Sequence, residues 1–314
     1  MLKINGLYQP MLANRIITGN VYWVGTTSST RNIDGQDLPS HGNDPRKPFA
    51  SLDYALSKCT ADNDDAVVIL AGHSETLTGA GGLTLDVAGV SIIGMGRYDA
   101  RPRFLMDGSA ITGLVTAANV SLENCIFAAG HSDIASALLV TGKGFRLEGC
   151  RFELNTTNEN FVNYINGGGS ANQCDGLEII NNVFDSGVDI GMINPIDILY
   201  NANDVKIMGN KIMGDFQTSP YAAIYAVNTV VMFNLEIGYN MIHNLHDANA
   251  VVGISAGSTA STGWMHHNIV YALDTNTGTP FVSAATGIAM WDNKYAHAAN
   301  ISAYQMPTLG TYQA

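Results

Sequence analysis

One short pattern returns through most of the chain and restricts the folds that the chain can adopt. In Val205–Ile212, apolar residues alternate along a strand-like run, Asn210 follows, and an apolar residue comes two positions later. Equivalent segments recur at intervals of 25 to 32 residues. Their aligned position holds Cys125, Cys150, Asn182, Asn210, Asn240, Asn268 and Asn293. Seven occurrences at such a period are typical of a repeat architecture, in which each unit packs on its neighbours.

Each repeat also contains a second run of strand length ahead of this motif, joined to it by small or polar residues. These runs are Ile111–Thr116, Ala137–Thr141, Phe161–Ile165, Ile196–Tyr200, Ala222–Val227, Val251–Ser255 and Phe281–Ala284. Antiparallel hairpins are the alternative, but they would not give an in-phase repeat that contains three turns. The sequence therefore predicts an all-β fold, a right-handed parallel β-helix. Each strand would pair with its counterpart one coil away, at about 4.8 Å.

Period-two alternation assigns the apolar positions of the repeat to the inside of the coil. The residues five before the motif position are Val120, Phe145, Leu177, Val205, Leu235 and Ile288. Those three before it are Leu122, Leu147, Ile179, Ile207, Ile237, Met265 and Met290. Those two after it are Phe127, Phe152, Phe184, Ile212, Ile242, Val270 and Tyr295. The motif residues themselves are predicted to form an inward ladder at a turn, where each Asn bonds the turn backbone and the Asn of the next coil.

The start of the chain lacks the repeat. Residues 1–47 are predicted to form an arm and loop with one strand-like run, Asn20–Val24. Residues 48–64 are predicted to hold a capping helix, because Phe49–Cys59 has apolar residues at helical spacing and Ser51 suits the N-cap. Such a helix would close the open end of a solenoid that occupies residues 65–314.

Composition excludes several classes of partner. The net charge is −12 and no Arg follows Arg151, which disfavours binding to nucleic acid. No apolar run reaches the roughly 18 residues that a membrane span needs, and the N-terminus lacks the pattern of a signal peptide. Four Cys in a long chain do not predict a disulfide scaffold. Cys125 and Cys150 would lie on neighbouring coils, and we expect both to be reduced and half-buried. No cofactor is predicted.

Three groups of residues were weighed for chemistry, and none is assigned as a site. Glu153 and Asp185 would lie on adjacent coils, at about the 5 Å separation of a retaining glycosidase pair, but both also begin long loops. A second group could hold a transition metal, although its spacing matches no known motif and histidines are common in surface turns. It consists of His243, His246, Asp247, His266 and His267.

The third group, Asp62, Asp64 and Asp65 with Asn63, resembles part of a calcium loop but lacks its glycine and distal Glu, so a solvated turn is expected. A lyase of the pectate type usually needs clustered acidic ligands and a basic residue. The candidate bases Lys206, Lys211 and Lys294 are isolated, and this weighs against such a mechanism.

The outward positions carry a mixed strip that is expected to be solvated. It consists of Ser121, Arg146, Glu178, Lys206, Glu236 and Trp264. Beside it, Ile180, Met208 and Trp291 are predicted to be outward and apolar. They indicate either packing against another copy of the chain or scattered exposed side chains.

Two parts of the N-terminal region resemble known proteins. Gly42–Leu56 and Asp65–Glu75 resemble the first coil of pectate-lyase-like β-helix proteins. Asn14–Arg15, Thr18–Gly25 and Val87–Gly94 resemble a group of tailed-bacteriophage β-helix proteins. Members of that class are virion components, either tailspikes that bind or cleave host glycans or trimeric capsid decoration proteins. No catalytic motif transfers residue by residue.

The resemblance implies a virion protein that is made in the host cytoplasm. The repeats run almost to the end of the sequence and leave about 19 residues, 296–314. We therefore expect a homotrimeric capsid decoration protein without catalytic activity, in contact with capsid protein or other virion proteins. The alternatives are a tail-associated spike that binds or depolymerises a surface glycan and, third, a free polysaccharide lyase.

Overall fold

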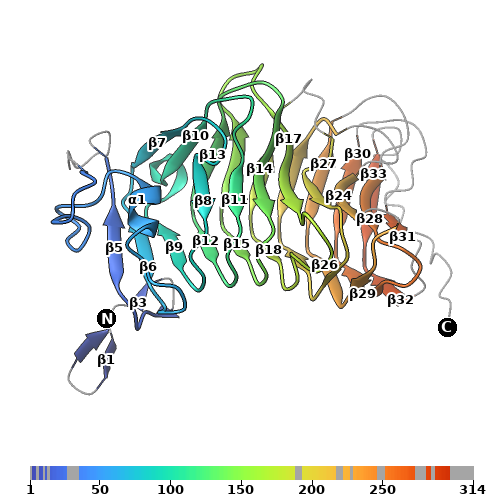
Figure 1. Cartoon of the computed structure of the whole chain (residues 1–314). Helices are drawn as coiled ribbons and strands as arrows, with labels where there is room; N and C mark the ends of the chain where they lie inside the picture. Colours follow the sequence, from blue (N-terminus) through green and yellow to red (C-terminus); the bar gives the residue numbers. More distant parts are fainter. Residues whose placement is uncertain are drawn as a thin grey trace.

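Three long parallel sheets form the faces of a solenoid (Figure 1). The computed structural model describes residues 2–4, 7–9, 11–12, 15–26, 35–187, 193–216, 222–226, 229–245, 252–272, 281–283 and 287–297. Strands from successive coils pair in parallel within each of the three sheets. The predicted all-β parallel β-helix is confirmed.

The chain visits the sheets in the same order in each coil, so each sheet collects strands far apart in sequence. Sheet I contains β5 (Val21–Val24), β6 (Ala66–Ile69), β9 (Ser91–Gly94), β12 (Ser121–Glu123), β15 (Arg146–Glu148), β18 (Glu178–Ile180), β22 (Lys206–Met208), β26 (Leu235–Gly238), β29 (Thr262–His266) and β32 (Gly287–Trp291). Sheet II contains β7 (Ser74–Leu77), β10 (Arg103–Met106), β13 (Ile126–Ala129), β16 (Arg151–Leu154), β19 (Val183–Asp185), β23 (Lys211–Gly214), β27 (Met241–Asn244), β30 (Ile269–Ala272) and β33 (Lys294–His297). Sheet III contains β8 (Leu83–Leu85), β11 (Gly113–Val115), β14 (Ile134–Val140), β17 (Phe161–Gly167), β20 (Ile196–Ile198), β24 (Ala222–Ala226), β28 (Val252–Ala256) and β31 (Phe281–Ser283).

Smaller elements lie outside these sheets. Two antiparallel hairpins precede the solenoid, β1 (Leu2–Ile4) with β2 (Leu7–Gln9), and β3 (Met11–Leu12) with β4 (Arg15–Ile16). A 3₁₀ helix spans Tyr98–Ala100, and β21 (Ala202–Asn203) pairs with β25 (Met232–Phe233). No helix among the described residues is long and apolar enough to cross a membrane.

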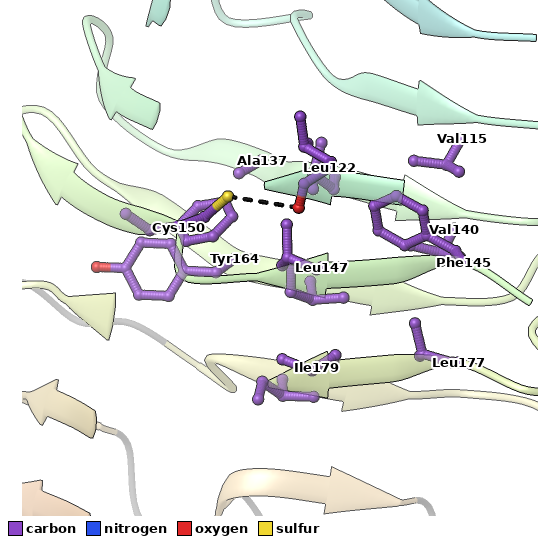
Figure 2. Close-up of a cluster of buried hydrophobic side chains, with 14 of the residues drawn as sticks. Val115, Leu122, Ala137, Val140, Phe145, Leu147, Cys150, Tyr164, Leu177 and Ile179 are labelled. Atoms are coloured by element: carbon purple, nitrogen blue, oxygen red, sulfur yellow. Dashed lines mark hydrogen bonds between the residues drawn. The ribbon is translucent and has the colours of Figure 1, made fainter. Parts of the chain in front are cut away.

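The core lies between the sheets and is built from columns of like side chains. Figure 2 shows Leu122, Leu147 and Ile179 aligned on successive strands of sheet I, all fully buried. On sheet II, Phe104, Phe127, Phe152 and Phe184 pair in register, and their ring centroids are 5.4, 5.2 and 5.0 Å apart. Offset stacking of this kind stabilises the core by about 0.5–1.5 kcal/mol per pair beyond burial.

One inward prediction is wrong. Met290 pairs in register with the fully buried Met265, yet Met290 is exposed. It lies on β32, which ends sheet I, so no further strand of that sheet covers its outer side. Terminal units of a solenoid lack one of their two neighbours, and this is the physical reason for the exposure.

The motif residues form a continuous ladder between sheets I and II. The side chain of Asn210 accepts hydrogen bonds from the backbone N–H of Asn182 at 2.9 Å and from its Nδ2 at 3.1 Å. Its own Nδ2 donates to Ile179 O at 2.9 Å and to Asn240 Oδ1 at 3.0 Å. The same bonds continue through Asn268 to Asn293. Every polar atom of such a buried amide therefore has a partner, as burial requires.

The ladder changes chemistry at its N-terminal end. Cys150 N–H donates to Asn182 Oδ1 at 2.9 Å, while the Cys150 thiol donates to Leu122 O at 3.7 Å (Figure 2). Cys125 and Cys150 are free and fully buried, which corrects the expectation of half-buried thiols. Burial raises the pKa of the Cys150 thiol to about 12.

The N-terminal end is closed by a short helix, α1 (Leu52–Leu56), as expected. Ser51 caps it by accepting a hydrogen bond from Tyr54 N at 3.3 Å, and Leu52, Ala55 and Leu56 are buried. The run predicted inside the arm is β5, which pairs with β6 and so belongs to sheet I.

Candidate functional site

Glu153 and Asp185, the candidate catalytic pair, lie on the neighbouring strands β16 and β19 of sheet II. Each comes directly after one residue of the register pair Phe152–Phe184. Both oxygens of Glu153 are engaged: Oε1 bonds Arg103 Nη1, and Oε2 lies 2.7 Å from Arg151 Nε. Asp185 Oδ1 accepts from Gly187 N at 3.2 Å. Glu153 is therefore held by the guanidinium groups of Arg103 and Arg151. Both carboxylates of the candidate pair belong to strands of sheet II.

Two of the four residues that resemble a calcium loop, Asp64 and Asp65, bind the segment that leads into β5. Asp65 is fully buried and its oxygens accept hydrogen bonds from Asn20 N at 2.6 Å and Thr60 N at 2.7 Å. Asp64 Oδ2 accepts from the backbone and hydroxyl of Thr18, both at 2.7 Å. The expected solvated turn is thus wrong for Asp65, because these carboxylates fasten the approach to β5 onto the solenoid.

The outward strip of sheet I carries ion pairs in its first half. Arg146 bonds Glu178 on the next strand and Glu148 at 2.7 Å, and Lys206 lies 3.8 Å from Glu178. Ser121, expected to be solvated, is buried in register with Arg146. Its other register partner is Ser91, which is buried as well, so the two short side chains lie side by side at the N-terminal end of the strip.

Asp197, at the centre of β20 in sheet III, is a buried acid that no sequence pattern singled out. It pairs in register with Asn166 and Tyr225, and its Oδ1 has no hydrogen-bond partner among the described residues. Burial raises its pKa to about 6. The surroundings of Asp197 therefore favour the protonated carboxylic acid more than water does.

A hollow of about 460 Å³ lies beside the 3₁₀ helix, near the N-terminal end. It is lined by Gly96, Arg97, Tyr98, Arg101 and Asn124. Tyr98 is 84% exposed and has a left-handed backbone (φ +53°), which is uncommon for a bulky residue. Arg101 Nε donates to Tyr98 O at 2.9 Å and so supports this conformation. The hollow therefore combines positive charge with a presented aromatic ring.

The structure divides the predicted histidine cluster. His243 lies on β27, with its ring edge-on to Tyr271 at 4.6 Å. Burial lowers the pKa of His243, and Lys211 lowers it further. His246 and Asp247 lie outside the described residues. His266 and His267 come together, with their Nδ1 atoms 3.1 Å apart. The part of the chain that the structure describes holds no group of three or more metal-ligating side chains.

Large apolar side chains are exposed mainly on the last coils. We define the C-terminal patch as Phe233, Tyr239, Met241, Trp264, Ile269, Met290 and Trp291. Met241 and Ile269 are neighbours in register on sheet II, and Trp291 pairs with His266 on sheet I. Tyr239 and Trp264 are 58% and 48% exposed. Of the predicted outward apolar residues, Trp291 belongs to this patch, whereas Ile180 and Met208 are half-buried.

Backbone geometry explains how the patch presents its side chains. The residue before each ladder position is left-handed in all seven coils, with φ between +53° and +67°. These residues are Asn124, Gly149, Asn181, Gly209, Tyr239, His267 and Asp292. Gly and Asn tolerate this conformation best, and Asp tolerates it better than bulky residues do. Tyr239 therefore occupies a position that strains its backbone, and strain of this kind often marks functional residues.

The sequence contained a signal for this arrangement. The column one position before the ladder changes from Asn and Gly to Tyr and His at the last coils. Reading that column as a turn position with positive φ would have identified Tyr239 and His267. The ladder column alone did not single out Tyr239, whereas His267 was already among the predicted metal-ligating candidates.

Comparison with known proteins adds one structural likeness. No protein-family model matches the chain, and no curated protein sequence does so. Among solved structures, a rhamnogalacturonan lyase is similar, with a TM-score of 0.39 and 13% sequence identity over 88% of this chain and 87% of that one. The likeness concerns the fold, a parallel β-solenoid.

Proposed function

We propose that the chain is a structural protein of a bacteriophage virion, a homotrimer that decorates the capsid. The observation that carries the assembly part is the C-terminal patch, because large apolar side chains gathered in exposed positions on the last coils favour a contact with another protein. The threefold symmetry and the phage origin rest on the resemblance of Thr18–Gly25 and Val87–Gly94 to phage β-helix proteins.

Other features of the molecule suit this role. The ladder and the in-register columns give a stiff rod, since each coil is bonded to the next through backbone and side chains. The hairpins β1–β2 and β3–β4 precede the solenoid, and in Figure 1 the β1–β2 hairpin projects from its N-terminal end. Such an arm is suited to attach a rod to capsid protein while the patch joins copies of the rod.

The mass of the purified chain in solution tests the assembly. We expect a trimer by light scattering coupled to gel filtration, and a smaller species for Met241→Glu, which places a charge in the patch. Met95→Glu is the matched control, because Met95 is an exposed methionine at the other end of the solenoid and should leave the mass unchanged. A monomeric wild type, or equal effects of the two substitutions, would overturn the assembly proposal.

Location in the particle tests the decoration role. Cryo-electron microscopy of the intact virion should show the solenoid on the head, with the arm toward the capsid. Density at the tail tip would instead assign the chain to a spike.

The hollow beside Tyr98 favours a second candidate, a tail-associated spike that binds an acidic surface glycan. Arg97 and Arg101 supply positive charge, and an exposed aromatic ring offers an apolar face to a sugar. Tyr98→Ala should then weaken retention of host capsular polysaccharide, while Tyr200→Ala, at another exposed tyrosine, should not. Release of reducing or unsaturated ends from that polysaccharide would indicate a depolymerase or the third alternative, a free lyase.

A further inference from the structure

We propose that His266 and His267 form a chelating site for a divalent transition-metal ion, bound through the Nδ1 atoms of both rings. The proposal is independent of whether the chain decorates a capsid. It begins with the backbone. Adjacent residues of a strand point to opposite faces. His267 follows the end of β29 in a left-handed conformation (φ +53°), and its ring meets that of His266 with the two Nδ1 atoms 3.1 Å apart.

Carboxylates face the other nitrogen of each ring. His266 Nε2 lies 3.5 Å from Glu236 Oε1, and His267 Nε2 lies 3.5 Å from Asp292 Oδ2. A carboxylate can only accept a hydrogen bond, so each favours the tautomer with the proton on Nε2. In a neutral imidazole the other nitrogen is then an acceptor. In the metal-free chain the 3.1 Å contact is a hydrogen bond, in which one of the two rings carries its proton on Nδ1. A bound cation would take the place of that proton, and both rings would then carry the proton on Nε2, where the carboxylates can accept it.

The spacing of the two nitrogens matches the bite of one metal ion. Zinc–imidazole bonds measure about 2.0–2.1 Å, so two nitrogens bound at angles of about 90–110° lie about 2.8–3.4 Å apart. Carboxylates on the far nitrogens are also the usual outer partners of metal-bound histidines, because they fix the tautomer and orient the ring. The pair therefore has both the separation and the supporting groups of a metal chelate.

Aromatic neighbours hold the two rings in place. His266 is 7% exposed and stacks on Trp291, with ring centroids 4.8 Å apart and planes 13° apart. Tyr239 stacks on His267 at 4.7 Å and meets His266 edge-on at 5.3 Å. The side chain of His267 is 39% exposed, so solvent reaches the pair from that side. Ligands that are ordered before binding lose less entropy when they bind.

The donor set indicates which ions would bind. Two imidazoles suit copper, nickel and zinc, and Cu²⁺ forms the strongest complexes of the divalent series. The described residues supply two nitrogens to the ion, so the remaining positions are open to water or to a side chain of a second copy. The expected occupant is thus Cu²⁺ or Zn²⁺ with a partly aqueous shell.

Titration of the full-length chain with Cu²⁺, after removal of any histidine tag, tests the site. Because Trp291 stacks on His266, bound Cu²⁺ should quench tryptophan fluorescence, and a large excess of Zn²⁺ should reduce the quenching by competition. Electron paramagnetic resonance should show two nitrogen ligands. The substitution His267→Asn should weaken binding at least tenfold, and it suits the fold because Asn124 and Asn181 occupy the equivalent left-handed position.

Two further substitutions separate this site from adventitious binding. Asp292→Asn removes an outer carboxylate while keeping a residue that tolerates positive φ, and it should weaken Cu²⁺ binding about tenfold. His131→Ala removes a half-buried histidine elsewhere and should not change Cu²⁺ binding. Absence of quenching in the wild type, unchanged affinity in His267→Asn, or an equal loss in His131→Ala would each overturn the proposal. Circular dichroism of each variant confirms that the β-helix fold is retained.

Discussion

The coils up to Gly209 and the coils from Leu235 onward share one backbone but use it differently. In the first group, Asn or Gly occupies the left-handed turn position, arginines pair with carboxylates outside, and phenylalanines stack inside. In the second group, Tyr239 and His267 occupy that turn position, and apolar side chains are exposed outside. The ladder secures the coil in both regions, and the neighbouring turn residue can therefore serve another purpose.

The core changes in a similar way, one coil earlier. The column that holds Phe127, Phe152 and Phe184 in the early coils continues as Ile212, Ile242 and Val270. Aromatic rings bury more surface than aliphatic side chains do. We therefore expect the early coils to contribute more to stability and the late coils to carry the contacts with other molecules.

The largest expected effect tests this division inside the core. Phe152→Ala removes a ring that stacks on both neighbours and should lower the free energy of unfolding by about 3–5 kcal/mol. Val270→Ala in the same column should lower it by roughly 2 kcal/mol, since two buried methyl groups are lost. Urea unfolding monitored by circular dichroism measures both. Equal losses would contradict the proposed division.

The ladder should behave alike in both regions. Asn210→Ala leaves Ile179 O and the backbone N–H of Asn182 without their partners, so unfolding should become easier by about 2–4 kcal/mol. Asn268→Ala breaks the corresponding bonds to Ile237 and Asn240 and should cost a similar amount. A loss at Asn268 below half of that at Asn210 would show that the ladder weakens toward the late coils.

Asp197, where the two regions meet, gives a pH-dependent prediction. Its folded pKa of about 6 exceeds the ordinary value of 3.8, so the protonated acid is favoured by folding. This contribution is fully present below about pH 4 and is lost as pH rises through about 6. Asp197→Asn should therefore raise the free energy of unfolding by about 1–3 kcal/mol at pH 7.5 and change it little at pH 4. Asp99→Asn, at an exposed carboxylate, should keep the wild-type profile.

The smallest effects concern the turn position. Gly149→Ala introduces a Cβ into open space, so its cost of about 1–2 kcal/mol reports the left-handed backbone alone. Tyr239→Asn relieves the same strain and loses the stack on His267, so stability should stay within about 1 kcal/mol of wild type. Thermal melts of the two variants compare them directly. A large loss for Tyr239→Asn would show that Tyr239 stabilises the coil and is not retained for a contact.

Most of the fold was predictable because the same pattern of inward and outward side chains recurs in every coil. Alternation around the ladder position fixes which residues point inward, and the spacing fixes which residues stack. The N-cap at Ser51 followed from the preference of helix starts for a hydroxyl acceptor. Met290 escaped the prediction because a pattern in sequence does not show where the stack of strands ends.

The sequence by itself determined the coil, the ladder and the inner columns, since these depend on side-chain type at a fixed period. Which surface residues meet depends on how the coils stack in three dimensions. Arg103 reaches Glu153 across 50 positions of sequence, and Glu236 and Asp292 reach a histidine pair from the coils on either side. The reason is that outward side chains are placed by the stacking of coils and by the left-handed turn at His267, and no local pattern records either.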